Sequence, residues 1–150
     1  MFGIVPNQYM HEQLRTKAGR HNIDAAFAVA SAEGIELEDE TIDSVVSTLV
    51  LCSVADESEV LAEVKRVLKP GGRFYFIEHV AAPKTTWLRR GQRMLRPAWR
   101  FLGDGSCPDR ETGLAIQQAG FESVDIDKFK VDRKIMPRFV SPHIAGVAIK

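Results

Sequence analysis

Apolar and polar residues in the middle of the chain, residues 43–80, follow a pattern that predicts a strand, a helix and a second strand. Residues 44–51 form an uncharged run of mostly β-branched and aliphatic side chains, which is typical of a parallel strand buried on both faces. Residues 73–80 form a second apolar run. A crossover of this kind places both strand ends at one edge of the sheet, where ligands usually bind in open α/β sheets.

The helix between these strands has clear start and stop signals. Asp56 is a good N-cap residue, and Glu59 at the third helical position makes the start similar to a capping box. Proline cannot continue a helix and glycine accepts a left-handed cap, so Pro70-Gly71-Gly72 is expected to end it. The apolar positions between these signals are Val60, Leu61, Val64, Val67 and Leu68.

Shorter elements are predicted on both sides of this unit from the same signals. A helix plus two strands is expected at the C-terminal end of the chain, with Gly120 as the cap of that helix. The expected elements are strands at residues 2–5, 25–30, 123–130 and 143–149, and helices at residues 8–18 and from Asp109 or Arg110 to Ala119.

Composition restricts the class of protein further. The 150 residues are 45% hydrophobic and 27% charged, which is enough for one globular domain, residues 1–150, with a sizeable core. The formal net charge is zero and predicts no general attraction to nucleic acid. No apolar stretch approaches the ~20 residues of a membrane span, and no signal-peptide pattern opens the chain, so a cytoplasmic location is predicted.

Two stretches carry a resemblance to a known family. The segments D-S-V-V-S-T-L-V-L and L-A-E-V-K-R-V-L-K-P-G-G-R-F-Y-F-I-E-H-V resemble the second half of the class I S-adenosylmethionine-dependent methyltransferases with a type 11 methyltransferase domain. Within that family the chain is most similar to the methyltransferase-like thiol methyltransferases. The resemblance implies a three-layer, Rossmann-like α/β sheet, mostly parallel, with an antiparallel hairpin at its C-terminal edge. Phe2-Gly3-Ile4 matches the second strand of the family, so the first strand and its glycine-rich loop are missing from this sequence.

The resemblance also implies S-adenosylmethionine as the cofactor and indicates which residues would contact it. Relatives carry an acid for the ribose hydroxyls at the end of their second strand, but Val5 occupies that position here and its side chain can accept no hydrogen bond. The positions that match the adenine loop and the pocket at the end of the central strand are Ser31, Ala32, Glu33, Thr48 and Leu49.

Glu78 and His79 are the candidate catalytic residues, at the carboxyl end of the second buried strand. Side chains alternate along a strand, so one of the two is expected to face the cleft. His79 titrates near neutrality and could act as a general base or orient a substrate thiol. The alternative is that both residues are hydrogen-bonded packing residues.

The segment Trp87 to Leu102 is predicted to be an amphipathic helix with a basic face, bent or broken at Pro97. Residues 84–100 contain six basic residues and no acidic one. A lid or packing helix is the preferred interpretation, because Trp and Leu stripes are more often core than membrane anchor. Peripheral contact with an anionic membrane is the alternative.

Two functions are compatible with these observations. The first is methyl transfer from S-adenosylmethionine to a small-molecule acceptor such as a thiol, a lipid or a quinone-like compound. The second is a catalytically inactive remnant that acts as an interaction module. Because the missing strand leaves two open sheet edges, the strand at residues 2–5 is expected to close directly onto residues 44–49; the alternative is an oligomer that covers the edges.

Overall fold

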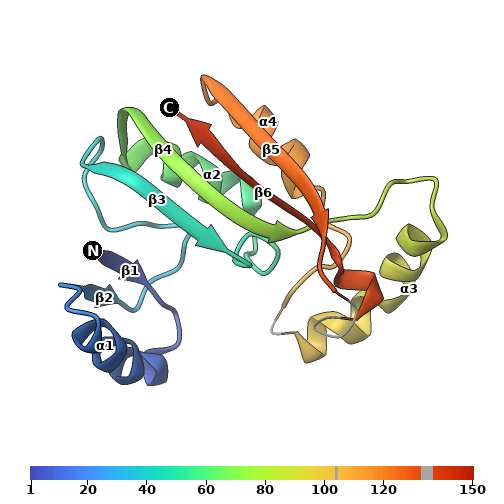
Figure 1. Ribbon diagram of the computed structural model, residues 1–150, viewed down its shortest axis with the longest axis horizontal. Coiled ribbons are helices and arrows are strands. Elements are labelled where there is room, and N and C mark those ends of the chain that lie inside the picture. Colours follow the sequence, from blue (N-terminus) through green and yellow to red (C-terminus); the bar gives the residue numbers. More distant parts are fainter. Residues whose placement is uncertain (104, 133–136) are drawn as a thin grey trace.

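Six strands and four α-helices make up the part of the chain that the structure describes, residues 1–103, 105–132 and 137–150 of a computed structural model (Figure 1). The strands are β1 (Phe2–Ile4), β2 (Ala26–Ala28), β3 (Ile42–Thr48), β4 (Leu68–His79), β5 (Ser123–Lys130) and β6 (Pro142–Ile149). The helices are α1 (His11–Arg20), α2 (Glu57–Val67), α3 (Trp87–Leu102) and α4 (Thr112–Gln118), with 3-10 turns η1 (Gln8–Met10) and η2 (Arg138–Val140).

Helix α2 begins where its sequence signals place it. The Asp56 side chain accepts hydrogen bonds from the backbone N–H groups of Ser58 (2.8 Å) and Glu59 (3.3 Å), which is the expected N-cap. Its end differs slightly from the prediction, because β4 starts directly after Val67 and already includes Pro70. Almost no loop therefore separates the end of α2 from the start of β4, and α2 is held close to the sheet.

Strands β3 to β6 form a mixed sheet in the order β3-β4-β6-β5. Strand β4 runs parallel to β3, whereas β6 is antiparallel to both of its neighbours, β4 and β5. The predicted Rossmann-like mixed sheet with an antiparallel C-terminal hairpin is confirmed. Helices α2 and α4 lie on one face of this sheet (Figure 1).

The core lies between that face and the two helices. Leu61 and Val64 of α2 pack there with Phe74 and Phe76 of β4 and Ile116 of α4, and each of the five is at most 3% exposed. Packing of this apolar surface is the main stabilising contribution to such a domain.

The opposite face of the four-stranded sheet carries no helix in the described residues. Val46 is 72% exposed there, and Tyr75 and Ile77 are 39% and 43% exposed. The expectation that β3 is buried on both faces is therefore wrong. Along β3 only Ile42, Val45 and Ser47 are partly buried, and the other side chains are exposed.

The N-terminal strands form a sheet of their own. Strand β1 pairs in parallel with β2, through Phe2–Ala26, Gly3–Phe27 and Ile4–Ala28, and with no other strand that the structure describes. The predicted closure of residues 2–5 onto β3 is therefore wrong. Figure 1 shows β1, β2 and α1 beside the β3 edge of the larger sheet. In the arrangement that the resemblance implies, the family's first strand lies between the strands that match β1 and β3. The outer edges of β1 and β3 are therefore the edges that would pair with that strand.

Other boundaries shift by a few residues. The helix predicted at residues 8–18 is divided into η1 and α1, and the helix predicted from Asp109 or Arg110 begins only at Thr112. Helix α3 continues through Pro97 from Trp87 to Leu102, so a break at that proline is not observed.

Gly146 in β6 offers a direct test of the sheet packing. A Cβ atom at this position would collide with the carbonyl oxygen of Asp125 and lie 2.6 Å from the ring of Phe76. We expect Gly146→Ala to lower the free energy of unfolding by about 3 kcal/mol, because the surrounding strands cannot yield without breaking the ladder. Urea unfolding followed by circular dichroism measures this change.

The matched control is Gly91→Ala in α3, where a Cβ atom would meet nothing within 4 Å. Alanine is the better helix former, so this variant should be as stable as the parent chain or more stable by up to about 1 kcal/mol. Equal stability of the two variants would contradict the close approach of β5, β4 and β6.

Candidate functional site

The candidate site lies at the carboxyl ends of β3 and β4, where a tight turn follows β3. Leu49, the first residue after β3, has φ = 56°, a left-handed conformation that costs a leucine about 1 kcal/mol or more. Its backbone N–H still donates to the carbonyl oxygen of Ile77 (2.9 Å). The chain thus leaves the sheet abruptly at Leu49, and the segment from Leu49 to Ala55, the β3 loop, crosses the carboxyl edge.

The carboxylate of Glu78 holds the β3 loop. Its Oε1 atom accepts hydrogen bonds from the hydroxyl of Ser47 (2.8 Å) and from the backbone N–H groups of Val50 (3.0 Å) and Leu51 (3.2 Å). Glu78 is fully buried, and this burial raises its pKa above the ordinary value, although the three donors partly oppose the shift. The side chain therefore substitutes for a backbone partner that the loop lacks.

Residues that follow α3 hold the other side of the β3 loop. The guanidinium of Arg110 donates to the carbonyl oxygens of Leu51 (2.6 Å) and Val54 (2.9 Å), and the backbone N–H of Cys107 donates to the carbonyl oxygen of Cys52 (2.8 Å). Sequence analysis assigned Arg110 only to a helix start. No local signal could identify this role, because Arg110 and Leu51 are 59 residues apart in the chain.

His79 is buried beside Glu78. Its Nε2 atom lies 2.9 Å from the Ser106 hydroxyl, and its ring meets the ring of His143 edge-on at 6.2 Å. Burial lowers the pKa of His79 to about 4, and electrostatic interactions with His143 and Arg110 add to this effect. His79 is therefore a neutral imidazole at pH 7. Neither of the two candidate catalytic residues projects into open solvent, since both are at most 5% exposed.

The residues predicted for the adenine loop lie after β2 and contact the β3 loop. One carboxylate oxygen of Glu33 accepts from the Ser31 hydroxyl, and the other accepts from the backbone N–H of Ala55 (2.8 Å). The hydrogen bond from Ser31 is the main cause that lowers the pKa of Glu33. Ala32 packs against the edge of the core. The structure thus brings the two predicted cofactor segments together through Glu33 and Ala55.

Thr48 and Val5 lie in different environments. Thr48 is exposed and lines a shallow hollow of ≈ 220 Å³ on the uncovered face of the sheet, next to Val46 and Ile77. The backbone of Val5 is engaged on both sides, because its carbonyl oxygen lies 2.9 Å from His11 Nε2 and its N–H donates to Ala28 (3.0 Å). Its side chain offers no group for a ribose hydroxyl.

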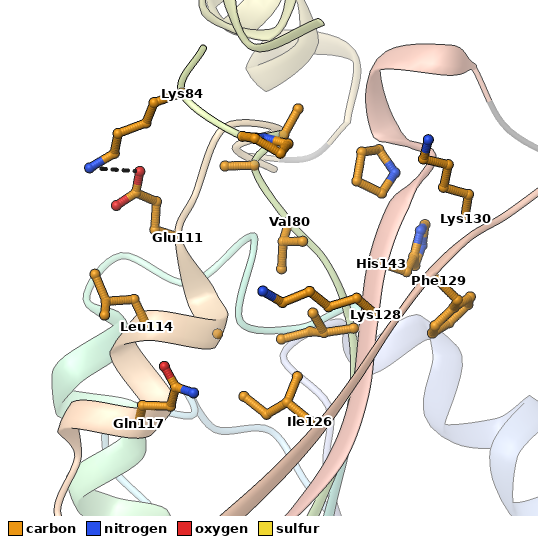
Figure 2. Close-up of a pocket in the computed structure, with 16 residues that line it drawn as sticks. Val80, Lys84, Glu111, Leu114, Gln117, Ile126, Lys128, Phe129, Lys130 and His143 are labelled. Carbon is orange, nitrogen blue, oxygen red and sulfur yellow. Dashed lines mark ion pairs between the residues drawn. The ribbon is translucent and has the colours of Figure 1, made fainter. Parts of the chain in front are cut away.

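A larger cavity of ≈ 730 Å³ opens beyond the end of β4, between α4 and the ends of β5 and β6 (Figure 2). Val80, Leu114, Ile126 and Phe129 make its walls largely apolar, and His143 lies at one side. Lys84 pairs with Glu111 at 3.4 Å across the opening, whereas Lys128 and Lys130 bring two more ammonium groups. None of the five predicted cofactor residues lines this cavity.

Comparison with known proteins gives matches along almost the whole chain. The methyltransferase domain family matches residues 1–76. Thiol S-methyltransferase TMT1B from Homo sapiens is 41% identical over 149 residues, which cover 97% of this chain and 60% of that protein. Thiol S-methyltransferase TMT1A from Homo sapiens is 42% identical over 132 residues, which cover 87% of this chain and 53% of that protein. The chain thus spans about 60% of the length of these relatives or less.

The crystal structure of the [4+2]-cyclase SpnF superimposes with a TM-score of 0.76, covering 99% of this chain and 65% of that one. Its sequence identity to this chain is 16%. A likeness at that level shows the fold alone, because one fold hosts many chemistries.

The first prediction for this site concerns the contribution of the Glu78 side chain to the free energy of unfolding. In Glu78→Ala, two backbone N–H groups and the Ser47 hydroxyl lose their acceptor, so we expect a loss of about 3 kcal/mol in the free energy of unfolding. Glu78→Gln keeps an acceptor oxygen and removes the buried charge, so its loss should be smaller. Urea unfolding compares both with Glu122→Ala, an exposed control. Equal effects of the Ala and Gln variants would refute the assigned role of the carboxylate oxygen.

The second prediction concerns the pH dependence of stability that the low pKa of His79 causes. Its pKa is about 4 in the folded chain and 6.5 ordinarily, so the unfolded chain binds more protons between these values. The free energy of unfolding should therefore rise with pH from about 4 to about 6.5, by up to ~1.4 kcal/mol per pH unit from this residue. Replacing His79 by Gln should flatten this dependence, whereas His21→Gln at an exposed site should leave it unchanged. Unfolding titrations across that pH range measure both slopes.

Proposed function

Since this chain belongs to the methyltransferase domain family, we propose that it acts in S-adenosylmethionine-dependent methyl transfer to a small-molecule acceptor, of which a thiol is the first to test. The relatives at 41% and 42% identity are named as thiol S-methyltransferases. The geometric observation that carries the proposal is the β3 loop. It is bound at the carboxyl edge of the sheet by Glu78, Arg110 and Glu33, which is where ligands of open α/β sheets bind.

The described residues supply part of a site for the cofactor. Ala32 and the turn at Leu49 could hold the adenine end, because the segment after β2 and the β3 loop are joined through Glu33 and Ala55. Thr48 ends β3 directly before that turn. The ribose end does not fit equally well, since Val5 presents only an apolar side chain where relatives carry an acid. When bound, S-adenosylmethionine supplies an already activated methyl group on a sulfonium.

The cavity beyond β4 is the proposed acceptor pocket. Its apolar walls suit an apolar molecule, and Lys128 and Lys130 place cationic groups at its side. Nearby cations lower the pKa of a thiol and favour the thiolate, which is the nucleophilic form. Thiol activation by these lysines is also compatible with the low pKa of His79, which makes its imidazole a weak base.

Glu78 and His79 are proposed to position the site rather than to react. Glu78 shapes the β3 loop through three hydrogen bonds, and His79 holds the segment at Ser106 beside it. Substitution of either residue would change cofactor affinity through the geometry of the loop. Neither residue would need to exchange a proton with the acceptor.

A second function, an inactive interaction module, is favoured by one observation. Strands β1 and β3 each keep an edge without a strand partner in the described part of the chain, and Val5 lies at the end of one of them. An edge of this kind is a template for pairing with another polypeptide. The two functions differ in whether the isolated chain binds the cofactor.

Calorimetric titration of the 150-residue chain with S-adenosylhomocysteine tests the proposed function. We expect micromolar binding, weakened about tenfold or more by Thr48→Lys, since every 1.4 kcal/mol of lost contact is a factor of ten. Thr16→Lys, an exposed threonine on α1, is the matched control and should bind as the parent chain does. No heat at millimolar ligand from a folded chain would refute the proposal and leave the interaction module.

A further inference from the structure

The outward face of α3 carries large apolar side chains that the fold leaves in solvent. Trp87, Met94 and Phe101 are 82%, 77% and 90% exposed, and Leu102 is 76% exposed. Positions seven residues apart lie on the same side of a helix, so the first three form one continuous stripe. We call these four residues the α3 apolar face. Such a patch is unusual on a soluble domain and marks an interaction site.

The opposite side of α3 already has its partners. The fully buried Gln92 side chain accepts from the backbone N–H of Ala82 (2.8 Å) and donates to the carbonyl oxygen of Phe139 (2.8 Å). Trp99 meets the Phe139 ring edge-on at 4.7 Å. The helix is therefore attached through this side, and a further rotation to bury the apolar face would break these contacts. Figure 1 shows α3 projecting at the end of the molecule opposite α1.

The charges of α3 are all positive, and they divide into two groups. Arg89 pairs with Glu111 (2.9 Å) and Arg96 with Asp109 (3.7 Å), toward the body of the protein. Arg93 and Arg100 are exposed and have no ion pair with any residue that the structure describes. Arg90 lies over the Trp87 ring at 4.7 Å. Three arginines that form no such ion pair thus accompany the apolar face.

We propose that the α3 apolar face and its arginines bind the surface of an anionic lipid bilayer. Tryptophan and phenylalanine side chains favour the boundary between headgroups and acyl chains, while arginines bind lipid phosphates. The helix would lie in the interface, since no helix among the described residues is both long and apolar enough to cross a bilayer. A second copy fits less well, because two such faces would bring like charges together.

The sequence pattern of α3 was compatible with two interpretations, a lid or packing helix and a helix that contacts a membrane. Packing accounts for Trp99 but not for Trp87, which differs from it by its exposure. A lid would cover a ligand with the side of the helix that faces the body, and that side is occupied by Gln92 and Trp99. The free charges and the exposed stripe therefore favour the bilayer.

Vesicle co-sedimentation of the full 150-residue chain tests the proposal. We expect binding to vesicles of phosphatidylcholine with phosphatidylserine, weaker binding to phosphatidylcholine alone, and a decrease with added salt because exposed charges are screened. Tryptophan emission should shift to shorter wavelength with the anionic vesicles, since Trp87 leaves water. The assay needs neither cofactor nor acceptor, so its result is independent of the proposed function.

Two variants separate the contributions of the face. Arg93→Glu with Arg100→Glu should lower the partition coefficient for anionic vesicles by about tenfold or more, because two attractive charges become repulsive. Phe101→Ser should lower it for both vesicle types. The matched controls are Arg15→Glu with Arg20→Glu, and Tyr9→Ser, which change exposed residues in or next to α1 and should stay within about twofold of the parent chain.

Three results would overturn the proposal. The first is a folded chain that does not bind anionic vesicles, and the second is an equal loss in the α1 controls, which would indicate a general charge effect. The third is an α3 variant that abolishes self-association in the absence of lipid but leaves vesicle binding unchanged. That outcome would assign the apolar face to a second copy of the chain.

Discussion

The buried carboxylate of Glu78 is the interaction on which the carboxyl edge of this domain depends. A polypeptide that leaves β3 through a left-handed leucine has backbone N–H groups that no strand can satisfy, and Glu78 accepts two of them together with the Ser47 hydroxyl. Backbone N–H groups left unpaired in the interior would each cost free energy, so this acceptor stabilises the path of the β3 loop. Burial raises the pKa of Glu78 above its ordinary value, and the hydrogen bonds oppose that shift only in part. Arg110 completes the arrangement from the other side of the loop.

The second constraint on the structure is that its strands form two separate sheets, β1-β2 and β3-β4-β6-β5. A sheet is stable when each strand is paired or covered, yet β1 pairs only with β2 and β3 only with β4 in the part of the chain described here. The same region leaves Val46 and Ile77 exposed on the face that no helix covers. These features and Val5 coincide with the cofactor side of the proposed site, whereas the proposed acceptor side, beyond β4, has a cavity of ≈ 730 Å³.

Helix α3 adds a different property to the domain. It is attached beyond β4 by Gln92 and Trp99 and leaves its apolar face and arginines in solvent. The proposed acceptor pocket begins with the residues that join β4 to α3, Val80 to Lys84. Contact of α3 with a bilayer would therefore hold the mouth of the pocket near the lipid surface. Apolar acceptors concentrate in that region, which links the two proposals without making either depend on the other.

Local physics made part of this fold predictable from the sequence, because the N-cap at Asp56, the apolar period of α2 and the apolar runs of β3 and β4 depend on neighbouring residues. The family and the antiparallel C-terminal hairpin followed from the resemblance of two segments to known methyltransferases. Other features depend on residues far apart in the chain. The pairing of β1, the exposure of one sheet face, the contact of Glu78 with a loop 27 residues away and that of Arg110 with one 59 residues away are decided only when the elements pack. The same holds for α3, whose two tryptophans are equivalent in the sequence pattern. Tertiary structure buries one side of that helix and leaves the other in water, because only one side meets η2 and the segment that follows β4.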